Sequence, residues 1–134
     1  MSPRPTSPVV PRIRGFTLIE LIVVLAIIAS LLTLAMPRYH HSVERSKEAV
    51  LKQDLQIMRD AIDKFFADRG RYPGTLEELA ERRYLRKVPP DPLTDSSTTW
   101  QVVAPPAGEA REGVYDVRSG APGKSLEGEP YESW

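Results

Sequence analysis

The residues whose chemistry stands out lie at the start of a long apolar stretch. From Phe16 to Met36 the only charged residue is Glu20, and the only other polar residues are Thr17, Ser30 and Thr33. An ionised carboxylate at the centre of a membrane-embedded helix costs about 2.5–3.5 kcal/mol, and less near the end of the helix. Glu20 is therefore either tolerated at the interface between lipid and water or neutralised by a cationic partner.

No group of residues in the sequence suggests catalysis. His40 and His41 are expected to have interfacial or solvated roles rather than to bind a metal, and nothing places Ser, His and Asp together as a triad. The sequence contains no cysteine, so it offers neither a disulfide framework nor a thiolate metal site. It also has no glycine-rich phosphate loop following a strand. We expect that the chain is not an enzyme.

The apolar stretch has the length of a membrane span. As an α-helix, residues 16–36 would be about 31 Å long, close to the hydrocarbon thickness of a bilayer. The basic residues Arg4, Arg12 and Arg14 precede the span, and no acidic residue does. This flank predicts a cytoplasmic N-terminus and places residues 37–134 across the membrane. Residues 1–15, rich in proline and arginine, are expected to form a disordered leader.

The formal net charge of zero conceals an uneven distribution. All 18 acidic residues follow the leader, together with 15 of the 18 basic ones, so the rest of the chain has a net charge of −3. Nucleic-acid binding needs a basic surface, and this acidic balance argues against it.

A second helical pattern follows the span. Pro37 has no amide hydrogen to bond with the Thr33 carbonyl, so we expect a kink or local unwinding there, with termination of the helix as the alternative. Gly70 is the expected C-cap. We predict one helix from Phe16 to about Arg69, its lower half in lipid and its upper half, residues 37–69, packed on a domain. Apolar residues at intervals of three and four mark its buried stripe: Leu51, Leu55, Met58, Ile62 and Phe65.

Shorter elements are expected after this helix. Thr75-Leu76-Glu77-Glu78 is a capping-box pattern, which predicts a helix over residues 76–83. Two strand candidates, near 100–103 and 114–117, flank a turn rich in proline and glycine at 105–113. Residues 118–134, the C-terminal loop, are expected to be irregular. We predict an α+β fold in which a small antiparallel sheet covers the apolar stripe of the long helix.

The start of the apolar stretch resembles a known processing signal. Gly15-Phe16-Thr17-Leu18-Ile19-Glu20, followed by an apolar run and by Pro37, is similar to the type III signal of type IV pilins and type II secretion pseudopilins. The resemblance implies a pilin-like fold, cleavage between Gly15 and Phe16 by a prepilin peptidase, and N-methylation of Phe16. It also implies that Glu20 pairs with the amine of Phe16 on a neighbouring subunit, and that Pro37 bends the helix.

The same resemblance implies a function and a set of partners. The chain would be a structural subunit of a type II secretion pseudopilus, located in the inner membrane and, once assembled, in a periplasmic filament with residues 16–36 at its core. The expected partners are copies of the same chain, minor pseudopilins, the prepilin peptidase and an inner-membrane assembly platform. The alternative is a major or minor type IV pilin acting in adhesion, motility or DNA uptake. A lone signal-anchored periplasmic domain is a third, more remote interpretation.

Later motifs are similar to those of the major, G-type pseudopilins of type II secretion. These motifs are Tyr72-Pro73 with Leu76 and Leu79, Asp91-Pro92, Val114-Tyr115-Asp116-Val117, Ser119-Gly120 and Trp134. The absence of cysteine points the same way, because type IVa pilins usually bracket their C-terminal region with a disulfide.

The G-type resemblance also implies calcium, and here this sequence departs from it. G-type proteins hold a calcium ion in the C-terminal loop through aspartates and main-chain carbonyls, yet this loop has Pro122 where an aspartate is expected. Calcium takes about six to eight oxygen ligands, with carboxylates prominent. The weak candidates here are Glu127, Glu129 and Glu132. We expect no cofactor, with calcium as the less favoured alternative.

Overall fold

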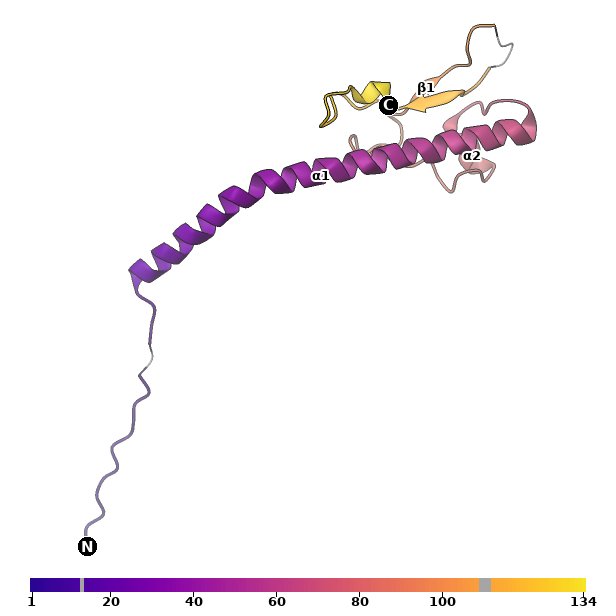
Figure 1. Ribbon diagram of the computed structural model, residues 1–134. Coiled ribbons are helices and arrows are strands. Elements are labelled where there is room, and N and C mark those ends of the chain that lie inside the picture. Colours follow the sequence, from indigo (N-terminus) through magenta and orange to yellow (C-terminus); the bar gives the residue numbers. More distant parts are fainter. Residues whose placement is uncertain (13, 109–111) are drawn as a thin grey trace. The chain divides into compact units, whose positions relative to one another are not determined.

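The computed structural model describes residues 1–12, 14–108 and 112–134, which form two compact units, Met1–Tyr39 and His40–Trp134. They make the α+β fold that the sequence predicts, a long helix with a small antiparallel sheet. Residue 13 of the expected leader and residues 109–111 of the expected turn lie outside the described residues. The elements are α1 (Leu18–Arg69), α2 (Leu76–Glu81), β1 (Gln101–Val103), β2 (Asp116–Arg118) and the 3-10 helix η1 (Tyr131–Ser133) (Figure 1).

Within the first unit, α1 is apolar on every side. Its residues from Leu18 to Met36 are all exposed, whereas the core helix of a water-soluble protein buries at least one face. The stretch is long and apolar enough to cross a membrane. The hydroxyls of Ser30 and Thr33 each donate to the carbonyl four residues earlier, at 2.9 and 2.8 Å. Because these polar groups are satisfied inside the helix, they are compatible with lipid.

The helix starts later than predicted and passes through its proline. α1 begins at Leu18 rather than Phe16, because its first turn is capped from the preceding residue. It is continuous across Pro37, so termination or unwinding there is wrong, while a bend stays a prediction. After Arg69, Gly70 adopts a φ of +68°, the left-handed conformation that commonly ends a helix.

In the second unit, one face of α1 forms most of the hydrophobic core. Its buried residues include the predicted stripe: Leu51, Leu55, Met58, Ala61, Ile62 and Phe65. Apolar side chains from α2, the sheet and the loops complete the core: Leu76, Leu79, Leu85, Trp100, Val114 and Val117. Val50 and Ile57, at the edge of the stripe, remain exposed.

Local hydrogen bonds start α2. The side chain of Thr75 accepts from the amide of Glu78 at 3.2 Å, as a helix cap does. The Glu78 carboxylate accepts in turn from the Gly74 amide at 2.7 Å and from the Arg71 guanidinium at 2.6 Å. The bond from Arg71, and after it the bond from Gly74, lowers the pKa of Glu78 to about 2.

Two predicted boundaries are wrong. The short helix ends at Glu81 rather than at residue 83, because Arg83 has a φ of +66°, outside the α-helical region. The second strand is Asp116–Arg118 rather than 114–117. It starts later because the amide of Val114 donates to the carbonyl of Pro73 at 2.7 Å instead of joining the sheet.

The sheet consists of β1 and β2 alone in the described part of the chain. The strands are antiparallel, with Val102 opposite Val117. β1 starts at Gln101, one residue later than expected. Trp100 instead lies in the core, where its indole N–H donates to the carbonyl of Pro89 at 2.7 Å.

Arg59 fixes this small sheet to α1. Its guanidinium bonds to the carboxylate of Asp116 at 2.8 Å and to the carbonyl of Val117 at 2.9 Å. A two-stranded sheet is marginally stable by itself. Its attachment to the helix by Arg59 and by the apolar core is therefore what holds it in place.

The Asp91-Pro92 and Ser119-Gly120 motifs meet in the interior. Asp91 is fully buried, and its two carboxylate oxygens accept from the amide of Leu93 and the hydroxyl of Ser119, at 2.8 and 2.7 Å. Gly120 lies so close to Thr99 that a Cβ atom would overlap the Thr99 carbonyl oxygen. The two motifs thus join the segment before β1 to the segment after β2.

Replacing Gly120 by alanine is expected to lower the free energy of unfolding by about 1–3 kcal/mol, because the new methyl group must displace the backbone of Thr99. Chemical unfolding of the full chain in detergent micelles, followed by tryptophan fluorescence, measures the change. Gly74→Ala is the matched control, since a Cβ atom there makes only an ordinary contact. Equal stability of Gly120→Ala and wild type would contradict the prediction.

Replacing Glu78 by glutamine is expected to destabilise the domain at neutral pH and progressively less in acid. The folded pKa lies below the ordinary value of 4.5, so the ionised carboxylate stabilises the fold above that pH. This contribution is lost as the pH falls from 4.5 towards about 2. Unfolding of wild type and variant across this range measures it, with Glu77→Gln as an exposed control on α2. A wild-type advantage that stays constant with pH would refute it.

Candidate functional site

The predicted cleavage position lies in an open segment just before α1. Residues 14–17 are exposed and have no regular structure, and a side chain added at Gly15 would meet no neighbouring atom. The side chain of Phe16 is also uncovered. Exposed, non-helical backbone is the preferred substrate of proteases. The Gly15–Phe16 bond is thus accessible in this structure, and its cleavage stays a prediction.

A side-chain cap that sequence reasoning missed closes the first turn of α1. The Thr17 hydroxyl accepts from the amide of Glu20 at 3.2 Å, and the Thr17 carbonyl accepts from the amide of Leu21 at 3.2 Å. Thr17 is therefore the N-cap, and Glu20 stands at the third helical position, the spacing of a capping box. The same spacing predicts α2 from Thr75 and Glu78, so it offers the signal that would have found this cap.

Glu20 occupies the first turn of α1 and is exposed. The amide groups of a helix N-terminus carry a partial positive charge, which favours a carboxylate there. Among the described residues, however, no basic side chain lies within salt-bridge distance of Glu20. The described part of the chain therefore places no full positive charge against this carboxylate.

The other predicted assembly residue lies at the opposite end of the apolar stretch. Pro37 is exposed and is separated from Glu20 by about 25 Å of helix. Gly15, Phe16 and Glu20 therefore lie close together in the chain around the start of α1, whereas Pro37 lies apart from them. The role of Pro37 in assembly stays a prediction.

The three glutamates of the C-terminal loop do not fit a calcium site. Glu127, Glu129 and Glu132 are all exposed. Glu129 borders a hollow that also contains Lys52, whereas Glu132 borders a different hollow beside Arg118. Within the described ranges, no three acidic or histidine side chains are grouped so that they could hold a metal ion. Such separated carboxylates do not supply the converging oxygens that calcium takes.

Comparison with known proteins supports the pilin-like character of the chain. Residues 11–36 match the prokaryotic N-terminal methylation motif. The type II secretion system core protein G of Pseudomonas aeruginosa is 32% identical over 127 residues, with 82% of this chain and 84% of that protein covered. The protein of the same name from Escherichia coli K12 is 30% identical over 125 residues, with 81% of each chain covered. No solved structure matches the chain.

The extent of the matches separates the two branches of the family. The type IV major pilin protein PilA of Myxococcus xanthus is 41% identical over 69 residues, but these cover 52% of this chain and only 31% of that protein. The similarity to core protein G extends over most of both chains. With the methylation motif and the apolar first half of α1, this establishes that the chain belongs to the core protein G family of major pseudopilins and is a structural subunit of a type II secretion pseudopilus.

Proposed function

We propose that a prepilin peptidase cleaves this pseudopilin between Gly15 and Phe16 and methylates the new amine of Phe16. The mature subunit then enters a filament through residues 16–36 of α1. The observation that carries the proposal is Glu20, the one ionisable group on an apolar helix surface that is exposed throughout. Its partner must come from outside the segment that surrounds it.

Cleavage supplies such a partner. The precursor has an amide at Phe16, whereas the mature chain has a basic amine, which stays cationic after addition of one methyl group. In a filament core with little water, an unpaired amine or carboxylate would be heavily penalised, and a pair neutralises both. A subunit would therefore fit best at the position along the filament axis where its amine meets the Glu20 carboxylate of a neighbouring subunit. The Thr17 cap supports this role because it fixes Glu20 in the first helical turn.

The basic leader supports the proposed membrane topology. Arg4, Arg12 and Arg14 keep the N-terminus in the cytoplasm, so the unit from His40 onward faces the periplasm. Removal of the leader removes these three charges. The amine of Phe16 is then the positive charge that remains ahead of the apolar stretch, so less charge holds the helix on the cytoplasmic side when the inner-membrane assembly platform draws the subunit out of the bilayer.

The apolar surface of α1 has two uses in this proposal. Before assembly, lipid covers the exposed side chains from Leu18 to Met36. In the filament, the same side chains pack against other copies of the chain and against minor pseudopilins. Residues 1–36 thus carry the processing and assembly functions, and the proposal assigns no catalytic role to the chain.

Intact mass measurement of the protein from its native membrane is expected to show a chain that starts at Phe16 and carries one additional methyl group. Fragmentation should place the methyl group on the N-terminal residue. Cells that lack the prepilin peptidase provide the control and should contain the chain starting at Met1. An unprocessed chain in cells with an active peptidase would contradict the proposed cleavage.

Replacing Glu20 by alanine is expected to abolish filaments and export while leaving cleavage at Phe16 intact, because it removes the proposed partner of the amine. Glu20→Gln keeps the shape and should fail similarly, which assigns the effect to charge. Ser30→Ala is the control within the same helix, since its hydroxyl bonds only to its own helix. Electron microscopy of filaments measures assembly, and mass analysis of the subunit measures cleavage, so the two steps are followed separately. Normal filaments from Glu20→Ala would rule out the proposed pairing.

A further inference from the structure

The C-terminal loop is fastened to α1 by a single carboxylate. One oxygen of Glu48 accepts from the amide of Leu126 and from the hydroxyl of Tyr131, each at 2.8 Å. These partners lie 78 and 83 residues away along the chain. Bonds to an ionised acceptor are roughly twice as strong as bonds between neutral groups. Glu48 therefore connects both the backbone of the loop and its 3-10 helix to the core helix.

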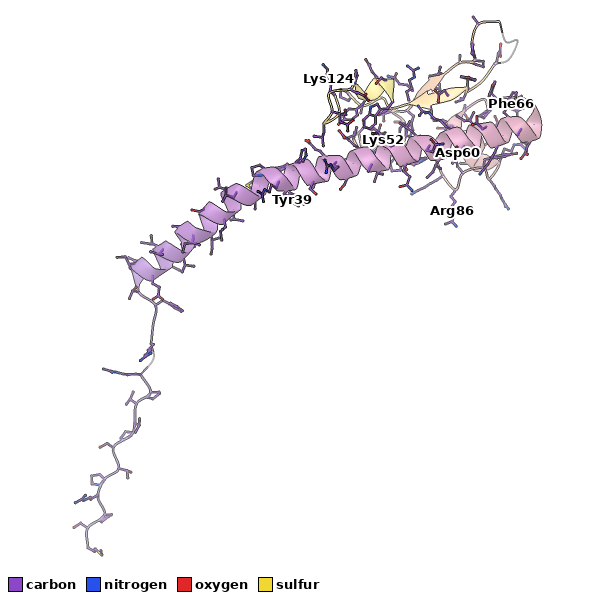
Figure 2. The ribbon with its side chains drawn as sticks, in the orientation of Figure 1. Tyr39, Lys52, Asp60, Phe66, Arg86 and Lys124 are labelled. Carbon is purple, nitrogen blue, oxygen red and sulfur yellow. The ribbon has the colours of Figure 1, made fainter. Side chains whose placement is uncertain are left out.

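Lys52 provides a second contact one turn further along α1. Its ammonium group lies 4.5 Å from the ring centroid of Trp134, and Tyr131 meets the same ring edge-on at 5.3 Å. Figure 2 shows Lys52 on the side of α1 that carries the loop, and Lys124 on the loop itself. Residues four apart lie on one helical face, so Glu48 and Lys52 act on the loop together.

The hydrogen bonds inside the C-terminal loop do not leave the free acceptor oxygens that a cation needs. The hydroxyl oxygen of Ser125 accepts from the amides of Glu127 and Glu129 at 3.3 and 3.2 Å, and Ser125 is itself buried. The amide of Ser125 donates to the carbonyl of Glu129 at 2.7 Å. A cation needs converging oxygens with free lone pairs. Here two amide donors converge on the hydroxyl oxygen of Ser125, and the carbonyl of Glu129 already accepts a hydrogen bond from the amide of Ser125.

Asp91, the one buried carboxylate among the described residues, is also committed to protein partners. Both carboxylate oxygens of the buried Asp91 accept hydrogen bonds, one of them from Ser119 at the base of the loop. In the described part of the chain, the only buried side-chain polar atom without a partner is the indole nitrogen of Trp134. That nitrogen is a donor, which cannot coordinate a metal.

The phenol of Tyr131 stays protonated and can therefore donate its hydrogen bond to Glu48. Burial, followed by its hydrogen bond to Glu48, raises the pKa of Tyr131 to about 12. The phenol therefore keeps its proton over the whole physiological range, and the bond to Glu48 is not lost by ionisation.

We propose that Glu48 does in this protein what a bound cation would do: it positions the C-terminal loop on α1, so that the loop folds and stays attached without calcium. The proposal concerns the folded subunit and holds whether or not the chain is cleaved or polymerises. Its failure is therefore distinguishable from failure of the proposed processing and assembly.

The test uses the full chain in detergent micelles and measures trypsin cleavage after Lys124, which lies in the loop. The cleavage rate follows the fraction of molecules in which the loop is open. For wild type, calcium and a calcium chelator are expected to give the same cleavage rate and the same thermal unfolding midpoint. Slower cleavage or a higher midpoint in calcium would overturn the proposal.

The Glu48→Ala variant is expected to raise the rate of cleavage after Lys124 at least about tenfold, because two bonds to an ionised acceptor are lost together. Glu44→Ala, one turn earlier on α1, removes an equal charge but no bond to the loop and should leave the rate unchanged. Tyr131→Phe keeps the ring against Trp134 and removes one bond, so it should give a smaller increase and reports on the contact even if Glu48→Ala fails to fold. Wild-type rates in both Glu48→Ala and Tyr131→Phe would overturn the role of Glu48.

Discussion

Burial of one face of α1 is the constraint on which the rest of the folded domain depends. The sheet has only two strands of three residues each, too little to form a core of its own. The helix supplies the missing apolar surface between Leu51 and Phe65. Polar side chains on the same helix then fasten the remaining parts: Arg59 holds β2, and Glu48 holds the C-terminal loop. A long, regular helix can therefore organise a domain in which most of the other residues are irregular.

The same helix meets two different environments along its length. Its first part, Leu18 to Met36, is apolar all round, and its polar side chains other than Glu20 bond within the helix. Its last part is apolar on one face only and buries that face against protein. This change in pattern divides the chain into an apolar anchor and a domain with its own hydrophobic core. A pseudopilus subunit needs both properties, because it begins in a membrane and ends in a filament.

The sequence allowed the local features of the fold and the site to be predicted, because each rests on neighbouring residues. The apolar stripe, the cap at Thr75 and the processing signal around Gly15 are all patterns within a few positions. The boundary of β2 could not be derived, since it depends on a bond between Val114 and the distant Pro73. The hydrogen bonds of Glu48 to Leu126 and Tyr131 are equally long-range. In the sequence, Glu48 is a glutamate on a helix like several others, and no nearby residue indicates these partners. The Thr17 cap has the same Thr-x-x-Glu spacing as the cap at Thr75, so it too was derivable from neighbouring residues.

The position of that cap has a consequence for the leader. Thr17 lies after the Gly15–Phe16 bond, and the hydrogen bonds described for the first turn of α1 come from Thr17, Glu20 and Leu21. The proposed cleavage would therefore leave the first residue and the register of α1 unchanged. No refolding of the helix would have to accompany it. In these hydrogen bonds, the leader contributes nothing to the start of the helix that follows it.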